Sequence, residues 1–122
     1  MLIYSDEVMQ YINDATRISV LHDGSVDSIV SAELLIRHMR IRGHTFSILQ
    51  TTQEKLPEFI PTRCGENHLL VLLNLGQSIS LSPLLPPEGR IVLVAVQMPV
   101  HIDNILASNV YVLDDGTSLL QF

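Results

Sequence analysis

The chain has 122 residues, of which 47% are hydrophobic and 16% are charged, so it can fill one hydrophobic core and does not have the composition of a disordered tail. Thirteen acidic residues against seven basic ones give a formal charge of −6, which is the wrong sign for a protein that holds a nucleic-acid backbone by itself. The single cysteine, Cys64, cannot form an internal disulfide, and no apolar run reaches the roughly 18 residues of a membrane span. We therefore expect one soluble domain in a reducing, intracellular compartment.

The first half of the chain begins with signals for a short helix over residues 5–15, capped by a serine and carrying an apolar stripe. Residues 17–22 form a compact β-prone run that ends at an Asp-Gly-Ser turn and predict the first strand. Helical spacing of apolar side chains over residues 26–41, with a glycine just beyond, predicts the main helix. Residues 45–50 predict a second strand, and the prolines and glycine that follow predict a loop over residues 51–67.

The second half contains two continuous apolar runs, residues 68–73 and 91–96, typical of strands that are covered on both faces. Between them, three prolines allow only a brief helix within residues 78–89. Residues 99–106 predict a short helix with a proline near its first position, and residues 109–113 predict a last strand.

Strands and helices therefore alternate, and the linkers after both apolar strands are long enough for the crossovers of a parallel sheet. This pattern predicts an α/β domain with a doubly wound, mostly parallel sheet of five strands and helices on both faces. Ligands of such sheets bind beyond the carboxyl ends of the strands. Functional side chains are therefore expected in residues 22–27, 74–76, 96–101 and 114–115.

The strand end after residue 22 contains His22, Asp23, Ser25 and Asp27. These residue types could ligate a pair of divalent metal ions that activates water for phosphoester cleavage. They could also be turn and capping residues, with Asp27 favourable to the helix dipole. Spacing alone favours this second, structural interpretation. Neither the glycine and lysine pattern of a P-loop nor a G-x-G-x-x-G motif is present.

Residues 18–32, Ile-Ser-Val-Leu-His-Asp-Gly-Ser-Val-Asp-Ser-Ile-Val-Ser-Ala, resemble the first motif of the DHH phosphoesterase superfamily, to which RecJ nucleases belong. The resemblance continues in residues 70–76, with an asparagine before a glycine, and in residues 86–112. Within this superfamily, the chain most resembles the eukaryotic replication factors that join MCM and GINS in the CMG helicase. In their first motif two aspartates flank a valine; here Ser25 replaces the first aspartate and Asp27 keeps the second.

The chain also departs from the family pattern at the positions where metal ligands would be expected. Asn74 stands where an acid is needed, and Ala95, Val96 and Gln97 stand where the name-giving Asp-His-His would lie. Alanine and valine cannot ligate a cation, and the neutral amides are poor substitutes for carboxylates. The resemblance thus implies a vestigial site with no intact two-metal centre, no catalytic residues and no cofactor. Its positions are Asp23, Ser25, Asp27, Asn74, Ala95 and Gln97.

The leading hypothesis is a non-catalytic DHH-like domain, residues 1–122, that acts as a protein-interaction scaffold. The resemblance implies an N-terminal fragment of a longer nuclear protein that contributes to DNA replication initiation by contacting MCM and GINS. It also allows a weak contact with single-stranded DNA in the full complex.

Two alternatives remain open. One is an active Mn²⁺-dependent phosphoesterase that acts on single-stranded DNA or short nucleotides, in which His22, Asp23 and Asp27 are the ligands and His101 or Asp103 adds another. The other is a small sensor of single-stranded DNA that uses the arginines at positions 37, 40 and 42. The acidic net charge and the absence of tryptophan count against this sensor.

Overall fold

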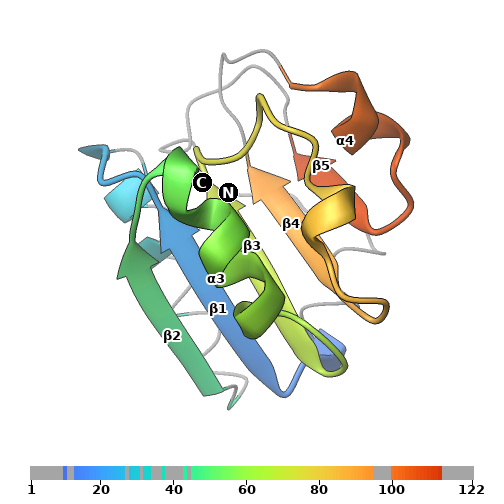
Figure 1. Cartoon of the computed structure of the whole chain (residues 1–122). Helices are drawn as coiled ribbons and strands as arrows, with labels where there is room; N and C mark the ends of the chain where they lie inside the picture. The colour runs from blue at the N-terminus through green and yellow to red at the C-terminus, as the bar shows by residue number, and fades with distance from the viewer. Residues whose placement is uncertain are drawn as a thin grey trace.

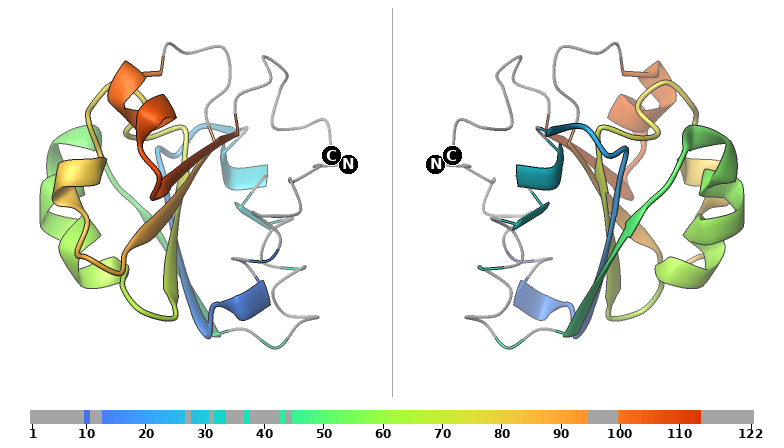
Figure 2. Two further views of the ribbon diagram at one scale, coloured as in Figure 1. Left: turned by 90° about the vertical axis from the view of Figure 1, so that its right-hand side faces the viewer. Right: turned by 90° about the vertical axis from the view of Figure 1, so that its left-hand side faces the viewer.

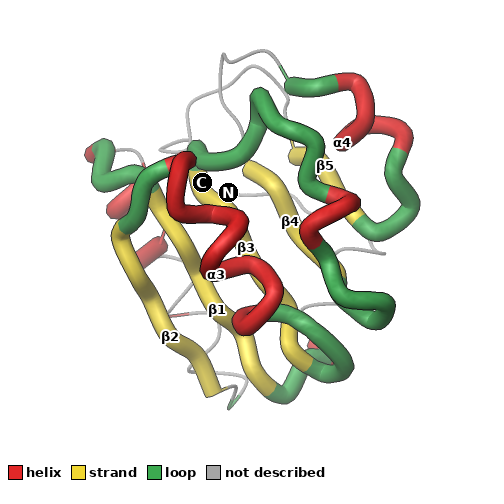
Figure 3. Tube along the Cα trace, in the orientation of Figure 1, coloured by secondary structure: helices red, strands yellow, loops and turns green. Residues whose placement is uncertain are grey.

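The computed structural model describes residues 10, 13–26, 28–30, 32–33, 37, 43, 45–94 and 100–113. Five strands form one sheet in which every neighbouring pair is parallel. Figure 1 draws the strands as arrows, and Figure 3 shows them lying side by side. The strands are β1 (Arg17–His22), β2 (Thr45–Gln50), β3 (His68–Leu73), β4 (Arg90–Val94) and β5 (Val110–Leu113). The first three bounds coincide with the predicted ones. β4 begins one residue earlier than predicted, and residues 95–96 of the predicted strand lie outside the described residues.

The central strands are buried on both faces because their side chains alternate between two hydrophobic layers. In β3, Leu69, Val71 and Leu73 belong to one layer, and Leu70 and Leu72 belong to the other. This double coverage explains why β3 and β4 are continuous apolar runs without a polar face.

Helical segments cover both faces of the sheet (Figure 2). On one face lie described helical residues that follow β1, among which Ala32 is buried in the core. On the other face lie α3 (Leu56–Arg63), the 3-10 turn η2 (Ser82–Leu84) and α4 (Ile102–Leu106). The predicted fold class, a doubly wound α/β layer, is therefore confirmed. The predicted brief helix within residues 78–89 is η2.

Helix α3 corrects the prediction of a loop over residues 51–67. A 3-10 turn, η1 (Gln53–Lys55), leads directly into α3, with Pro57 in its first turn and Pro61 inside it. A proline is tolerated in the first turn, where its missing N–H has no helical partner, whereas Pro61 removes one hydrogen bond. Leu56 and Ile60, one turn apart, are fully buried against the sheet. This burial outweighs the local preference for a loop.

Helix α4 is shorter than predicted. It begins at Ile102 with His101 as its N-cap, so the predicted start near residue 99 is wrong. The His101 ring accepts a hydrogen bond from the backbone N–H of Asp103 and stabilises the first turn.

The strand order β2-β1-β3-β4-β5 places the point where the chain changes direction between β1 and β3. Arg17 of β1 lies beside Thr45 of β2 on one side and His68 of β3 on the other. In sheets of this order the connections after the two central strands leave on opposite faces, which opens a crevice at their carboxyl ends. The residues that directly follow β1 and β3 are Asp23 and Asn74.

Candidate functional site at the carboxyl ends of the strands

Asp23 and Asn74 meet at the carboxyl edge of the sheet, as the strand-end rule predicts. The Asn74 side-chain amide donates a hydrogen bond to Asp23 Oδ2 at 2.7 Å. Asn74 has a left-handed backbone with φ of 58°, a conformation that asparagine and aspartate tolerate better than most residues. Its backbone N–H donates to the carbonyl of Val94 at 2.9 Å. The ends of β1, β3 and β4 are therefore tied together at this point.

Three further hydrogen bonds reach the other oxygen of Asp23. Oδ1 accepts from the backbone N–H of Ser25 at 2.9 Å, and the hydroxyls of Ser25 and Ser28 each lie 2.7 Å from it. Ser25 is also the N-cap of the following helical turn, because its hydroxyl accepts from Ser28 N at 3.3 Å and its carbonyl accepts from Ile29 N at 2.9 Å. Asp23 therefore organises the turn between β1 and the helical residues after it.

The hydrogen bonds also decide the charge of Asp23. Partial burial by itself raises the pKa of this carboxyl, but the donors from Ser25, Ser28 and Asn74 together lower the pKa below its ordinary value. Asp23 is therefore ionised at neutral pH, and the charge is held by neutral donors.

His22 is buried at the end of β1, and its ring is occupied within the same turn. Its Nδ1 accepts a hydrogen bond from the backbone N–H of Gly24 at 3.1 Å. Gly24 has φ of +86°, and a Cβ there would lie 2.5 Å from the Gln50 side-chain nitrogen. The positive φ therefore favours glycine at this position, and the turn holds the His22 ring in place.

His101 and Asp103, the alternative ligands, are both exposed at the start of α4. His101 Nδ1 lies 3.8 Å from Asp103 Oδ2 and accepts from the Asp103 backbone. The ring nitrogen of His101 therefore caps the first turn of α4.

Three of the proposed vestigial positions, Asp27, Ala95 and Gln97, lie outside the described residues, as do the arginines at positions 40 and 42. Of the six positions the structure places Asp23, Ser25 and Asn74, and it brings all three together through Asp23.

The described residues by themselves do not assemble a two-metal centre. Such a centre needs several carboxylate or imidazole ligands that converge on one point. No group of three His, Cys, Asp or Glu side chains that could hold a metal ion occurs among the residues the structure describes. Asp23 Oδ1 accepts three hydrogen bonds and Oδ2 accepts one, from the Asn74 amide nitrogen. The side-chain oxygen of Asn74 is buried and has no hydrogen-bond partner among the described residues.

Sequence reasoning did not single out four buried polar residues near this edge, which are Ser28, Thr51, Gln77 and Asn104. Ser28 had a detectable signal, because it stands at the third position after the capping Ser25 and faces back toward it. Thr51 follows β2, Gln77 lies in the loop after β3, and Asn104 lies in α4. Their burial depends on contacts between distant segments.

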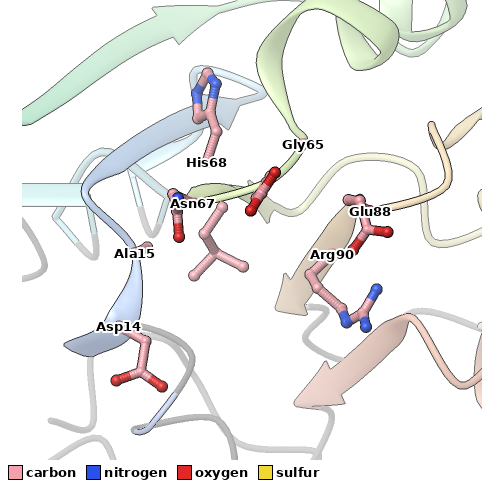
Figure 4. Close-up of a pocket in the computed structure, with 9 residues that line it drawn as sticks. Asp14, Ala15, Gly65, Asn67, His68, Glu88 and Arg90 are labelled. Carbon is pink, nitrogen blue, oxygen red and sulfur yellow. The ribbon is translucent and has the colours of Figure 1, made fainter.

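A separate hollow of about 210 Å³ lies at the opposite, amino-terminal edge of the sheet. Asp14, Gly65 and Arg90 border it from three separate segments (Figure 4). Because ligands of doubly wound sheets bind at the carboxyl edge, this hollow does not belong to the candidate site.

No protein-family model and no curated protein sequence matches the chain. Solved structures match the chain in fold. CDC45 from Entamoeba histolytica matches with a TM-score of 0.75 and 17% sequence identity, over 95% of this chain and 25% of that one. RecJ in complex with Mn²⁺ from Thermus thermophilus matches with a TM-score of 0.62 and 16% identity, over 92% of this chain and 16% of that one. The chain has the DHH-like fold of these proteins.

The chain spans about a quarter of the length of the CDC45 that it matches and less of the RecJ. The fold likeness is greater to CDC45 than to RecJ. Within the described part of the chain, no helix combines the length and the apolar character needed to cross a membrane.

Proposed function

We propose that this chain is a non-catalytic DHH-like domain of a nuclear DNA replication factor that joins MCM and GINS in the CMG helicase and acts there as a protein-interaction scaffold. In this proposal Asp23, Ser25, Asp27, Asn74, Ala95 and Gln97 are the remnants of a metal site. The domain uses its surface, and not a reaction, to perform its function.

The hydrogen-bond network around Asp23 is the observation that carries the proposal. A carboxylate that binds a catalytic cation must offer lone pairs to it, whereas Asp23 accepts from Ser25, Ser28 and Asn74. The Asn74 amide supplies partial positive charge to Asp23 Oδ2 from the neighbouring strand end. The network therefore stabilises Asp23 without a cation.

The comparisons support a CDC45-like role over a RecJ-like one, since the match to CDC45 has the higher TM-score and covers slightly more of this chain. The acidic net charge of −6 suits a surface that meets proteins better than one that grips DNA.

A direct binding measurement tests the scaffold role. The purified chain is immobilised and exposed to purified GINS and to the N-terminal tier of MCM in biolayer interferometry, with bovine serum albumin as the control. We expect saturable binding to at least one of the two. Binding to neither would overturn the proposal.

Calorimetric titration with Mn²⁺ and a hydrolysis assay on short single-stranded DNA test the enzymatic alternative. We expect neither Mn²⁺ binding in the micromolar range nor hydrolysis. Hydrolysis that Mn²⁺ supports and Asp23→Asn abolishes would show an active phosphoesterase and contradict the non-catalytic assignment.

A further inference from the structure

Helix α4 is fastened to the domain by a polar side chain. Asn104 is fully buried. Its Oδ1 accepts from the backbone N–H of Leu81 at 3.0 Å, and its Nδ2 donates to the carbonyl of Ile79 at 2.7 Å, with the carbonyls of Gly76 and Gln77 at 3.4 Å. The backbone N–H of His101 adds a bond to the Gln77 carbonyl at 2.7 Å. The loop after β3 therefore holds α4 through hydrogen bonds.

This attachment leaves the apolar side of α4 facing outward. Ile102, Ile105 and Leu106 are 58%, 58% and 75% exposed. Their spacing of i, i+3 and i+4 puts them on one stripe of the helix. Amphipathic surface helices normally bury such a stripe and expose their polar residues, so the orientation of α4 is the reverse of the usual one. Exposed apolar side chains grouped on one surface are more typical of interaction sites than single ones.

The size and charge of the stripe limit what can cover it. The surface of one helical turn is far smaller than the roughly 1,000 Å² that a stable interface between two copies needs. Two copies of the chain, each of charge −6, also repel each other. Within described residues 100–113, Asp103 is the one formally charged side chain at neutral pH, beside the titratable His101. Asp103 is about half exposed. A complementary partner therefore carries an apolar stripe next to a basic residue.

We propose that the stripe of Ile102, Ile105 and Leu106 docks an amphipathic helix of a protein partner in which lysine or arginine flanks the apolar residues. The three side chains pack between those of the partner helix, and the basic residue pairs with Asp103 at the rim. This inference rests on the proposed scaffold function and assigns that function a surface.

Substitutions on the stripe test the inference with GINS and the N-terminal tier of MCM as the probes. Leu106→Asp and Ile105→Asp are compared with Val26→Asp, whose wild-type side chain is 73% exposed and lies on the other face of the sheet. All three replace exposed side chains, so far-UV circular dichroism and the melting temperature should match those of the wild type. We expect the two α4 variants to bind at least about tenfold more weakly and Val26→Asp to bind like the wild type.

The outcomes separate the stripe from the scaffold function. Equal binding by the wild type and both α4 variants would overturn the docking surface and leave the scaffold function standing. Binding of neither probe by the wild type would overturn the scaffold function and the docking surface with it. A wild-type dimer in sedimentation equilibrium that Leu106→Asp dissociates would identify a second copy as the occupant and overturn the proposed partner.

Asp103→Lys tests the charge of the partner. We expect weaker binding and a smaller loss of affinity as the salt concentration rises, because the variant removes an opposite-charge pair and repels the basic residue. Unchanged affinity and an unchanged salt dependence would contradict the basic flank.

Discussion

The carboxylate of Asp23 accepts hydrogen bonds from two serines of its own turn and from Asn74, 51 positions away. It therefore connects local turn formation with the pairing of β1 and β3. A residue that the sequence marks as a candidate metal ligand thus has a structural task in the fold. This task predicts how the stability of the domain depends on pH.

The variant Asp23→Asn should lose about 1–3 kcal/mol of unfolding free energy at pH 7. A neutral amide oxygen accepts the hydrogen bonds of the turn less well than a carboxylate, and the amide NH₂ group would face the N–H and O–H donors of the turn. The pKa of Asp23 is lowered in the folded state, so its contribution is present above the unfolded-state pKa and is lost as the pH falls through the folded-state pKa. Urea denaturation at pH 7 and at about pH 3 measures the difference. An equal gap between wild type and variant at both pH values would contradict this role.

The variant Asn74→Asp places a second carboxylate against Asp23 while keeping a residue that tolerates the left-handed backbone. We expect a loss of about 1–3 kcal/mol at pH 7, because two like charges replace a charge-assisted hydrogen bond. The loss should shrink in mild acid, when the pair takes up a proton. Thermal denaturation of both proteins from pH 7 to pH 4 tests this, with Asn74→Gly as the control that keeps the backbone and adds no charge.

At the scale of the elements, α4 shows a helix whose stability depends on one buried amide. Asn104→Leu makes the helix more apolar but leaves the backbone N–H of Leu81 and the carbonyl of Ile79 without their side-chain partner. We expect this variant to lose about 2–4 kcal/mol of unfolding free energy. Ile105→Ala, which shortens an exposed side chain, should change the stability by less than about 0.5 kcal/mol. A more stable Asn104→Leu protein would refute the anchoring role.

The elements differ in how well the sequence predicts them. The strand bounds that the structure describes are predicted to within one residue, because apolar runs such as β3 are bounded by polar residues and turns. Helix α3 is missed because Pro57 and Pro61 dominate the local pattern, whereas the burial of Leu56 and Ile60 is a property of the assembled fold. The orientation of α4 is missed for a similar reason, since the bonds of Asn104 go to a loop more than twenty positions away.

The same distinction applies to the candidate site. The meeting of Asp23 and Asn74 follows from the rule that parallel strands end at one edge, so the sequence predicts it. The hydrogen bond between them does not follow from this rule. It depends on the left-handed backbone of Asn74 and on the closeness of Ser28, which only the packed turn produces.

At the scale of the whole molecule, Cys64 reports on the integrity of the core. It is buried in the layer under α3, and burial raises the pKa of its thiol to about 11, only partly offset by a backbone hydrogen bond with Arg90. Because the thiolate is the reactive form, labelling by a thiol reagent at pH 7.5 should require opening of the domain and should be far slower than in denaturant.

The rate of this labelling should therefore follow the stability of the domain. Gly89→Ala provides the matched variant, because a Cβ at position 89 would lie 2.9 Å from Cys64 Sγ. We expect this variant to be less stable and to label faster. Rapid labelling of the native wild-type protein would contradict the burial of the thiol.

The strand order also has a consequence for synthesis of the chain on the ribosome. The central partner of β1 is β3, in which His68 lies beside Arg17, so the innermost pairing waits until residue 73 has emerged. Long-range pairing of this kind delays folding, because a large loop must close before the contacts stabilise it. A nascent chain that ends at residue 50 contains β1 and β2 without β3, the strand that pairs with the other edge of β1, and we expect it to remain unfolded.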